Sequence, residues 1–191
     1  MIAKRRKACK NIVYQALTQA LLQQRPKSYW LPLFEKLTDK DLKEYPFPQE
    51  PLLSFALQNP DDLLFLLEKG LSVDQENDFG KTALFYAIGD NNLKAVEILL
   101  AHHADVNHKY FSAEKLRSEN ECNYPNLQHT LRSPLMHAAQ HSDVDMLKLL
   151  LNHGAKLHDV DELNESALNY AEKAGKQKNV QFLKEQLNKT Q

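Results

Sequence analysis

Residues 80–107 read GKTALFYAIGDNNLKAVEILLAHHADVN, and this stretch contains one complete structural repeat that other parts of the chain copy. A Thr or Ser, a small residue and a Leu open the copies at Thr82, Ser133 and Ser166, and an apolar helical pattern follows each opening. The last two openings lie 33 residues apart. A fixed period of this length predicts a protein whose units stack on their neighbours.

The period and the openings resemble one known family. A spacing of 33 residues with an opening of the form T-P-L-H-x-A is the signature of the ankyrin repeat. The copy that begins with SPLMHA at residues 133–138 follows this pattern most closely. The sequence therefore resembles the ankyrin-repeat family over about residues 50–187. The resemblance implies an all-α solenoid whose units each contain a β-turn and two antiparallel helices.

The array is predicted to hold four repeats, of which the first and the last are degenerate. The second and third openings are 51 rather than 33 residues apart, which leaves 18 extra residues between them. Insertions in such arrays emerge at loops. We expect an ordered finger with a short helix after Ser112, and disorder is the alternative. The ranges are 50–76, 77–109, 128–160 and 161–187 for the repeats, 110–127 for the insertion and 188–191 for a tail.

Several positions depart from the family pattern. His103 stands where the first and third repeats have Gly70 and Gly154, which predicts a left-handed, strained residue. Leu131 replaces the usual Gly of the third turn, so the standard turn is in doubt there. Apolar packing is expected to replace the hydrogen bonds of the opening His, which is absent at the four equivalent positions Leu53, Phe85, Met136 and Asn169.

The last outer helix carries polar residues where the third repeat has apolar ones. Gln177, Asn179 and Lys184 take the places of Val144, Met146 and Leu151. The far side of a terminal repeat meets water and not another repeat. These three polar residues therefore predict a capping repeat whose outer face is solvated.

Residues 1–49 do not follow the repeat pattern, and we expect them to form a non-ankyrin helical cap on the first repeat. Apolar spacing predicts a helix at 8–22 and a second helix at 31–37. Thr38 to Asp41 resembles a capping box. Three prolines in YPFPQEP, residues 45–51, disfavour helix and mark the boundary with the array.

Charge is unevenly distributed along the chain. Residues 1–34 contain seven basic and no acidic residues, whereas the net charge of the whole chain is −1. This basic end indicates either a solvated helix face or binding to a polyanion. The sequence contains no apolar run long enough to span a membrane and no secretory signal pattern, so a cytoplasmic location is expected, with delivery into another cell left open.

The residues needed for common catalytic and cofactor sites are not arranged in recognisable patterns. The five glycines are not clustered as in nucleotide-binding loops, and two cysteines are too few for a disulfide framework or a zinc site. His137 and His141 share a helix face, yet no further ligands complete a metal site. Acidic pairs such as Asp61 with Asp62 stand at helix starts, where they cap free amides. We expect no enzyme activity, no cofactor and no metal.

The resemblance implies a protein-binding scaffold, in which the turn tips and the exposed side of the inner helices form a concave surface. An unidentified protein is the expected partner, with no small-molecule substrate, and the chain is expected to be a monomer. The predicted contact residues lie in the turns, at the ends of inner helices and in the insertion: Asp78, Phe79, Lys81, Asp90, Tyr110, Phe111, Tyr124, His129, Thr130, Arg132, Gln140, His141, Glu162, Leu163, Glu165 and Lys173.

Two other function classes are left open by the sequence. Residues 4–10 have the composition of a nucleic-acid or anionic-membrane binding segment. Cys122 in the insertion and His129 just after it are the one local thiol and imidazole pair that an enzyme could use. For the leading interpretation, the sequence does not distinguish an inhibitor, an immunity protein and a delivered effector.

Overall fold

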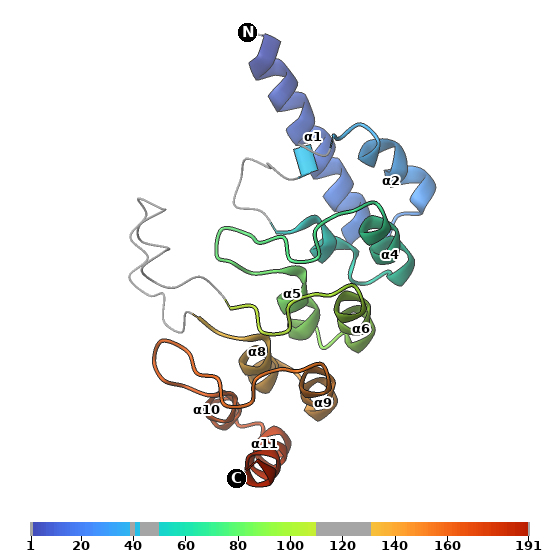
Figure 1. The fold of residues 1–191 in the computed structure, drawn as a ribbon. Coiled ribbons are helices and arrows are strands. Elements are labelled where there is room, and N and C mark those ends of the chain that lie inside the picture. The colour runs from blue at the N-terminus through green and yellow to red at the C-terminus, as the bar shows by residue number, and fades with distance from the viewer. Residues whose placement is uncertain (1, 39–40, 43–49, 110–130, 191) are drawn as a thin grey trace.

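The protein is a stack of helix pairs in the computed structural model, which describes residues 2–38, 41–42, 50–109 and 131–190, with side chains from residue 12 onward. Figure 1 shows the pairs following one another from the N-terminus to the C-terminus, with the connecting turns on one side. The expected all-α repeat solenoid is confirmed. Its pairs are α1 (Ile2–Leu22) with α2 (Lys27–Phe34), η1 (Leu52–Ala56) with α4 (Pro60–Glu68), α5 (Ala83–Gly89) with α6 (Leu93–Ala101), α8 (Pro134–His141) with α9 (Val144–Asn152), and α10 (Ala167–Lys173) with α11 (Gln177–Lys189).

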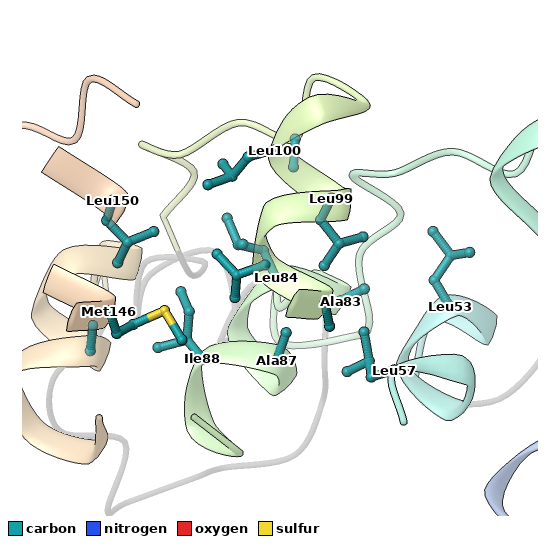
Figure 2. Close-up of a cluster of buried hydrophobic side chains, with 14 of the residues drawn as sticks. Leu53, Leu57, Ala83, Leu84, Ala87, Ile88, Leu99, Leu100, Met146 and Leu150 are labelled. Carbon is teal, nitrogen blue, oxygen red and sulfur yellow. The ribbon is translucent and has the colours of Figure 1, made fainter. Parts of the chain in front are cut away.

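Inner and outer helices form two parallel columns. Each inner helix contacts the next along the series η1, α5, α8 and α10, and each outer helix contacts the next along α4, α6, α9 and α11. The core lies between these columns and is continuous across repeats. Figure 2 shows Ala83, Leu84 and Ile88 of α5 between apolar side chains of the neighbouring pairs. This arrangement is what a repeat needs, because a single pair cannot bury its apolar face alone.

The helix starts are fixed by local capping, as expected from the sequence. Asn59 caps α4 by accepting from the amides of Asp61 and Asp62 at 3.1 and 3.4 Å, and Asp143 caps α9 in the same way. The side chain of Asp62 accepts in turn from Asn59 Nδ2 at 2.9 Å. These carboxylates therefore have a structural role, as predicted.

Left-handed residues recur at equivalent places in the turns. His103 has φ 66°, beside 83° for Gly70 and 88° for Gly154, so the prediction for His103 is confirmed. Leu131 has φ 59°, similar to Asn164 at 59°. Leu131 thus has the left-handed φ of its equivalent in the fourth repeat, despite its branched side chain.

The first repeat has a shorter inner helix than the others. η1 is a 3-10 helix of five residues, whereas α8 is an α-helix of eight residues. The sequence spacing places one residue fewer in this inner turn than in the second repeat, and the tighter 3-10 winding accommodates the shorter chain.

The N-terminal helix pair packs against the first repeat. α1 contacts η1, and the ring of Trp30 meets Phe65 of α4 edge-on at a centroid distance of 5.6 Å. The second helix differs from its prediction, because it spans Lys27–Phe34 and not 31–37. Pro26 at the N-cap, with φ −59°, starts the helix earlier. The capping box at Thr38 is confirmed, since Thr38 N donates to Asp41 Oδ2 at 2.9 Å and Asp41 N donates to Thr38 Oγ1 at 3.4 Å.

One prediction about the last helix is wrong. Asn179 was expected to face water, yet it is 2% exposed. Its Nδ2 donates to the carbonyl oxygens of Ala139 and Ser142, both at 3.1 Å. These carbonyls at the end of α8 need donors, and an amide one repeat further along supplies them. Gln177 and Lys184 are exposed, as predicted.

Candidate functional site

The turns of the second and fourth repeats are built by the same hydrogen bonds. Asn77 Oδ1 accepts from the amides of Phe79 and Lys81, both at 2.9 Å, and its Nδ2 donates to the hydroxyl of Tyr86 at 3.0 Å. In the fourth repeat Asp161 takes the place of Asn77, and its Oδ2 accepts from the hydroxyl of Tyr170 at 2.6 Å. In these two repeats a tyrosine of the inner helix therefore holds the turn in place.

His137 occupies the tyrosine position of the third repeat, four residues after the opening Ser133. Its ring lies 5.7 Å from the ring of Phe85 and 4.5 Å from that of His141, measured between centroids. Burial, followed by the positive charges of Arg132, His141 and Lys81, lowers the pKa of His137 to about 2. The imidazole is therefore neutral at physiological pH.

In the third and fourth repeats, the turn residue just before the opening Ser contacts the side chain eight residues later, on the surface of the inner helix. In the third repeat Arg132 Nη2 donates to Gln140 Oε1, and in the fourth Lys173 Nζ pairs with Glu165 Oε1. Arg132 Cζ also lies 4.1 Å from the ring centroid of Tyr170, a cation–π contact that crosses to the next repeat. These contacts form a row of charged side chains across neighbouring repeats.

In the second repeat the equivalent turn residue is Lys81, and the helix position eight residues later carries no side chain. Lys81 is equivalent to Arg132 and Glu165, whereas the helix position is Gly89. A pocket of about 120 Å³ lies here, lined by Lys81, Phe85, Tyr86, Gly89, Asp90 and His137. The missing side chain leaves this space open between α5 and α8.

Basic and acidic groups both lie near this pocket. Burial lowers the pKa of Lys81, Glu50 opposes that shift, and the charge of Arg132 adds to it. Burial and the charges of Arg132, Lys176 and Lys81 likewise lower the pKa of His141. Lys81 and Arg132 therefore share this neighbourhood with the carboxylates of Glu50, which acts on Lys81, and Asp90, which lines the pocket.

Six of the predicted contact residues lie either in the turns just before the inner helices or on those helices, and we call them the inner-helix face: Lys81, Arg132, Gln140, His141, Glu165 and Lys173. Asp90 lines the pocket at the end of α5. Asp78, Glu162 and Leu163 are exposed in the turns, and Phe79 is half-buried. Five predicted residues lie outside the described residues, namely Tyr110, Phe111, Tyr124, His129 and Thr130, as does Cys122.

Sequence reasoning missed three residues that build this face. Tyr86, His137 and Tyr170 each follow a repeat opening by four residues, so aligning the openings would have found them. A period-based alignment marks which residue types share a position. It does not show that a tyrosine there bonds to its own turn.

A larger hollow of about 480 Å³ lies where the third and fourth repeats meet, between the starts of α9 and α11. Its polar groups include side chains that already form hydrogen bonds between repeats. Lys176 Nζ donates to the carbonyl oxygens of His141 and Ser142 at 3.0 and 2.7 Å. Asp143 accepts from Asn91 Nδ2 at 2.9 Å. This hollow is therefore a structural junction.

The described part of the chain contains neither a cluster of metal ligands nor a helix suited to span a membrane. No group of three or more His, Cys, Asp or Glu residues is placed there to hold a metal ion. Among the same residues, no helix combines the length and the apolar character that crossing a membrane requires.

Comparison with protein families agrees with the observed geometry. The family model for ankyrin repeats, which contains three copies of the repeat, matches residues 7–110 and 112–191. The chain belongs to the ankyrin-repeat family. The match begins within the segment 1–49 that the sequence analysis set apart from the array. Ankyrin repeats are generally protein–protein interaction modules and generally non-catalytic.

Proposed function

We propose that this chain binds a partner protein through the inner-helix face and the insertion at residues 110–127. The observation that supports this most directly is the row of charged and polar side chains that Arg132, Gln140, Glu165 and Lys173 form across two repeats. Stacked repeats provide a large surface without catalytic groups, which suits recognition of a protein. Roles as an inhibitor, an immunity protein or a delivered effector all fit such a surface.

Arg132 is the expected centre of the contact. Its guanidinium is held between Gln140 and the ring of Tyr170, so little side-chain entropy remains to be lost on binding. Its Nε is buried and has no hydrogen-bond partner among the described residues. Arginine beside an aromatic ring is the composition typical of interface hot spots.

The test is affinity capture of a partner by the wild-type chain and by a variant with Ala at Phe79, Arg132 and His141. The matched control has Ala at Lys94 and Glu97, which are exposed on the outer helix α6. We expect the first variant to lose capture and the control to retain it. If deletion of residues 111–130 abolishes capture while the first variant binds normally, the contact lies in the insertion and not on the inner-helix face.

A second candidate function is binding of nucleic acid or of an anionic membrane surface by α1. The first part of α1 extends beyond the stacked repeats in Figure 1, and the sequence places Lys4, Arg5, Arg6 and Lys7 there. Binding to DNA, RNA or acidic vesicles should fall with rising salt and collapse when these four residues are neutralised. Absence of any binding at low salt would remove this function.

A further inference from the structure

The N-terminal helix α1 has an exposed face without charge. Tyr14, Leu17 and Leu21 are buried in the core that α1 shares with α2 and η1. The exposed positions recur three or four residues apart on the other side of the helix, and they are Ile12, Gln15, Ala16, Gln19, Leu22 and Gln23. No charged residue occurs between positions 11 and 24. This face therefore lacks the charges that usually occur on an exposed helix face in water.

The most exposed large apolar side chains of the described chain lie on or beside this face. They are Ile12 at 64%, Tyr29 of α2 at 59% and Leu22 at 56%. Gln23 connects the face to Tyr29, because its Oε1 accepts from Arg25 Nε at 3.3 Å and Arg25 Cζ lies 5.8 Å from the centroid of the tyrosine ring. We call the surface formed by Ile12, Leu22, Arg25 and Tyr29 the α1 surface.

Basic residues flank the uncharged part of α1 at both ends. Residues 4–10 contain five lysines and arginines in the first turns of the helix, and Arg25 follows shortly after its end. The first acidic residue of the chain is Glu35, after the last residue of α2. The segment that carries the α1 surface is therefore complementary to a negatively charged ligand.

The nearest exposed carboxylates belong to another element. Asp61 and Glu68 are exposed on α4, which meets α2 where Phe65 contacts the ring of the buried Trp30. Lys27 is directed to α4 as well, since its Nζ lies 3.3 Å from the centroid of the Phe65 ring. We therefore leave Lys27 out of the α1 surface.

A bilayer of anionic lipid fits this arrangement better than a nucleic acid does. Affinity for nucleic acid comes largely from cations on the contacting face that pair with phosphates. The middle of α1 has no cation, and it exposes Ile12 and Leu22 instead. Helices at a bilayer surface combine basic residues, which attract anionic head groups, with apolar side chains that enter the boundary with the acyl chains. Tyrosine is also typical of this boundary.

We propose that the α1 surface binds a bilayer that contains anionic lipid, with Ile12, Leu22 and Tyr29 at the boundary between head groups and acyl chains. The basic residues of positions 4–10 and Arg25 lie among the head groups. α1 lies along the bilayer, because its exposed apolar residues are distributed along its length. The inference rests on the second candidate function, since it selects one of the two kinds of ligand given there.

The test is co-sedimentation of the full chain with two kinds of vesicle, one of phosphatidylcholine with phosphatidylserine and one of phosphatidylcholine alone. We expect binding to the first kind only, because phosphatidylserine supplies the negative charge. Ile12→Gln combined with Leu22→Gln should lower this binding at least about tenfold, because two apolar side chains no longer leave water. The matched control is Val160→Gln, which replaces an exposed apolar side chain in the fourth repeat and should leave binding unchanged.

The contribution of charge is tested by a second pair of variants. Glutamine at all four basic positions of residues 4–7 should lower vesicle binding at least about a hundredfold, because each cation near an anionic surface contributes to the affinity. The matched control has glutamine in place of four exposed lysines of the outer helices, and it should bind like the wild type: Lys94, Lys148, Lys178 and Lys189. Urea unfolding establishes that each variant is folded.

Three results would overturn the bilayer contact. The first is equal binding to both kinds of vesicle, or binding that the double change at Ile12 and Leu22 leaves intact. The second is binding to DNA or RNA that is tighter than vesicle binding and unaffected by the same double change. The third is a dimer in analytical ultracentrifugation that the double change dissociates, without vesicle binding, which would assign the α1 surface to a second copy of the chain.

Failure of this inference and failure of the candidate functions give different results. Binding to nucleic acid without binding to vesicles leaves the second candidate function standing and removes the bilayer contact. Absence of binding to vesicles, DNA and RNA at low salt removes both. Capture of a partner protein is measured with variants of the inner-helix face, so its outcome does not depend on α1.

Discussion

The guanidinium carbon of Arg132 lies 4.1 Å from the centre of the Tyr170 ring, so a turn residue of the third repeat is held by the inner helix of the fourth. The hydroxyl of the same tyrosine donates to Asp161. One side chain thus fixes its own turn and the arginine of the preceding repeat. The turn residue Arg132 is therefore positioned by the repeat that follows it.

Tyr170→Phe should lower the free energy of unfolding by about 1–3 kcal/mol, because it leaves the buried carboxylate of Asp161 without one of its donors. The equivalent change Tyr86→Phe removes a bond to the neutral side chain of Asn77 and should cost about 0.5–1.5 kcal/mol. Urea unfolding measures both. A larger loss for Tyr86→Phe would contradict the importance of the charged acceptor.

His103→Gly should raise the free energy of unfolding by about 0.5–1 kcal/mol, because glycine adopts φ 66° without the strain that a side chain brings. The reciprocal change Gly154→Ala, at φ 88° with open space around the added Cβ, should destabilise by a similar amount. Thermal or urea melts of the two variants test the pair. A loss of stability in His103→Gly would show that contacts of the His103 side chain stabilise the fold by more than the strain of its left-handed backbone destabilises it.

Stability should fall with decreasing pH because of His137. Its pKa is about 2 in the folded chain against the usual 6.5, so below pH 6.5 the unfolded chain binds a proton that the folded chain does not. The stability that depends on the neutral His137 imidazole is fully present above pH 6.5. On acidification the free energy of unfolding falls, by about 2 kcal/mol at pH 5.

The measurement is urea unfolding of the wild type and of His137→Gln at pH 7.5 and pH 5. Carboxylates titrate in both proteins, so the difference between the two isolates the imidazole. We expect the stability of the wild type to fall relative to the variant between these pH values. An unchanged difference would mean that His137 becomes protonated within the fold.

Asn179→Ala should cost about 1–3 kcal/mol, because it leaves the buried carbonyl oxygens of Ala139 and Ser142 without this donor. Gln177→Ala on the same helix is the control, and as an exposed change it should stay within about 0.5 kcal/mol. Equal effects of the two changes would restore the solvated role that the sequence suggested for Asn179.

The architecture was predictable because local sequence signals specify the helices of each repeat and their ends. Apolar spacing marks the helix pairs, Asn59 and Asp143 mark helix starts, and Gly70 with Gly154 marks where outer helices end. Each of these signals acts within a few residues. The left-handed backbone conformation of His103 was predicted from the same comparison of repeats, since this position requires a left-handed residue whatever its side chain.

The candidate site was predictable only in part. Sequence comparison placed Lys81, Arg132, Glu165 and Lys173 on one face, because equivalent positions of a solenoid face the same way. It missed the roles of Tyr86 and Tyr170, whose hydroxyls act on residues nine positions earlier. It also misjudged Asn179, because the outer face of a terminal repeat is usually solvated.

The sequence by itself determined the family, the helix pairs and the face that carries the charged residues, since these depend on periodicity and on local backbone preferences. The tertiary structure alone decided that Gly89 leaves a pocket beside Lys81, that Arg132 rests on Tyr170 and that Asn179 is buried. Each of these facts depends on distances between residues from different repeats. Such distances are set by how the helix pairs stack, and the pattern within a single repeat does not contain them.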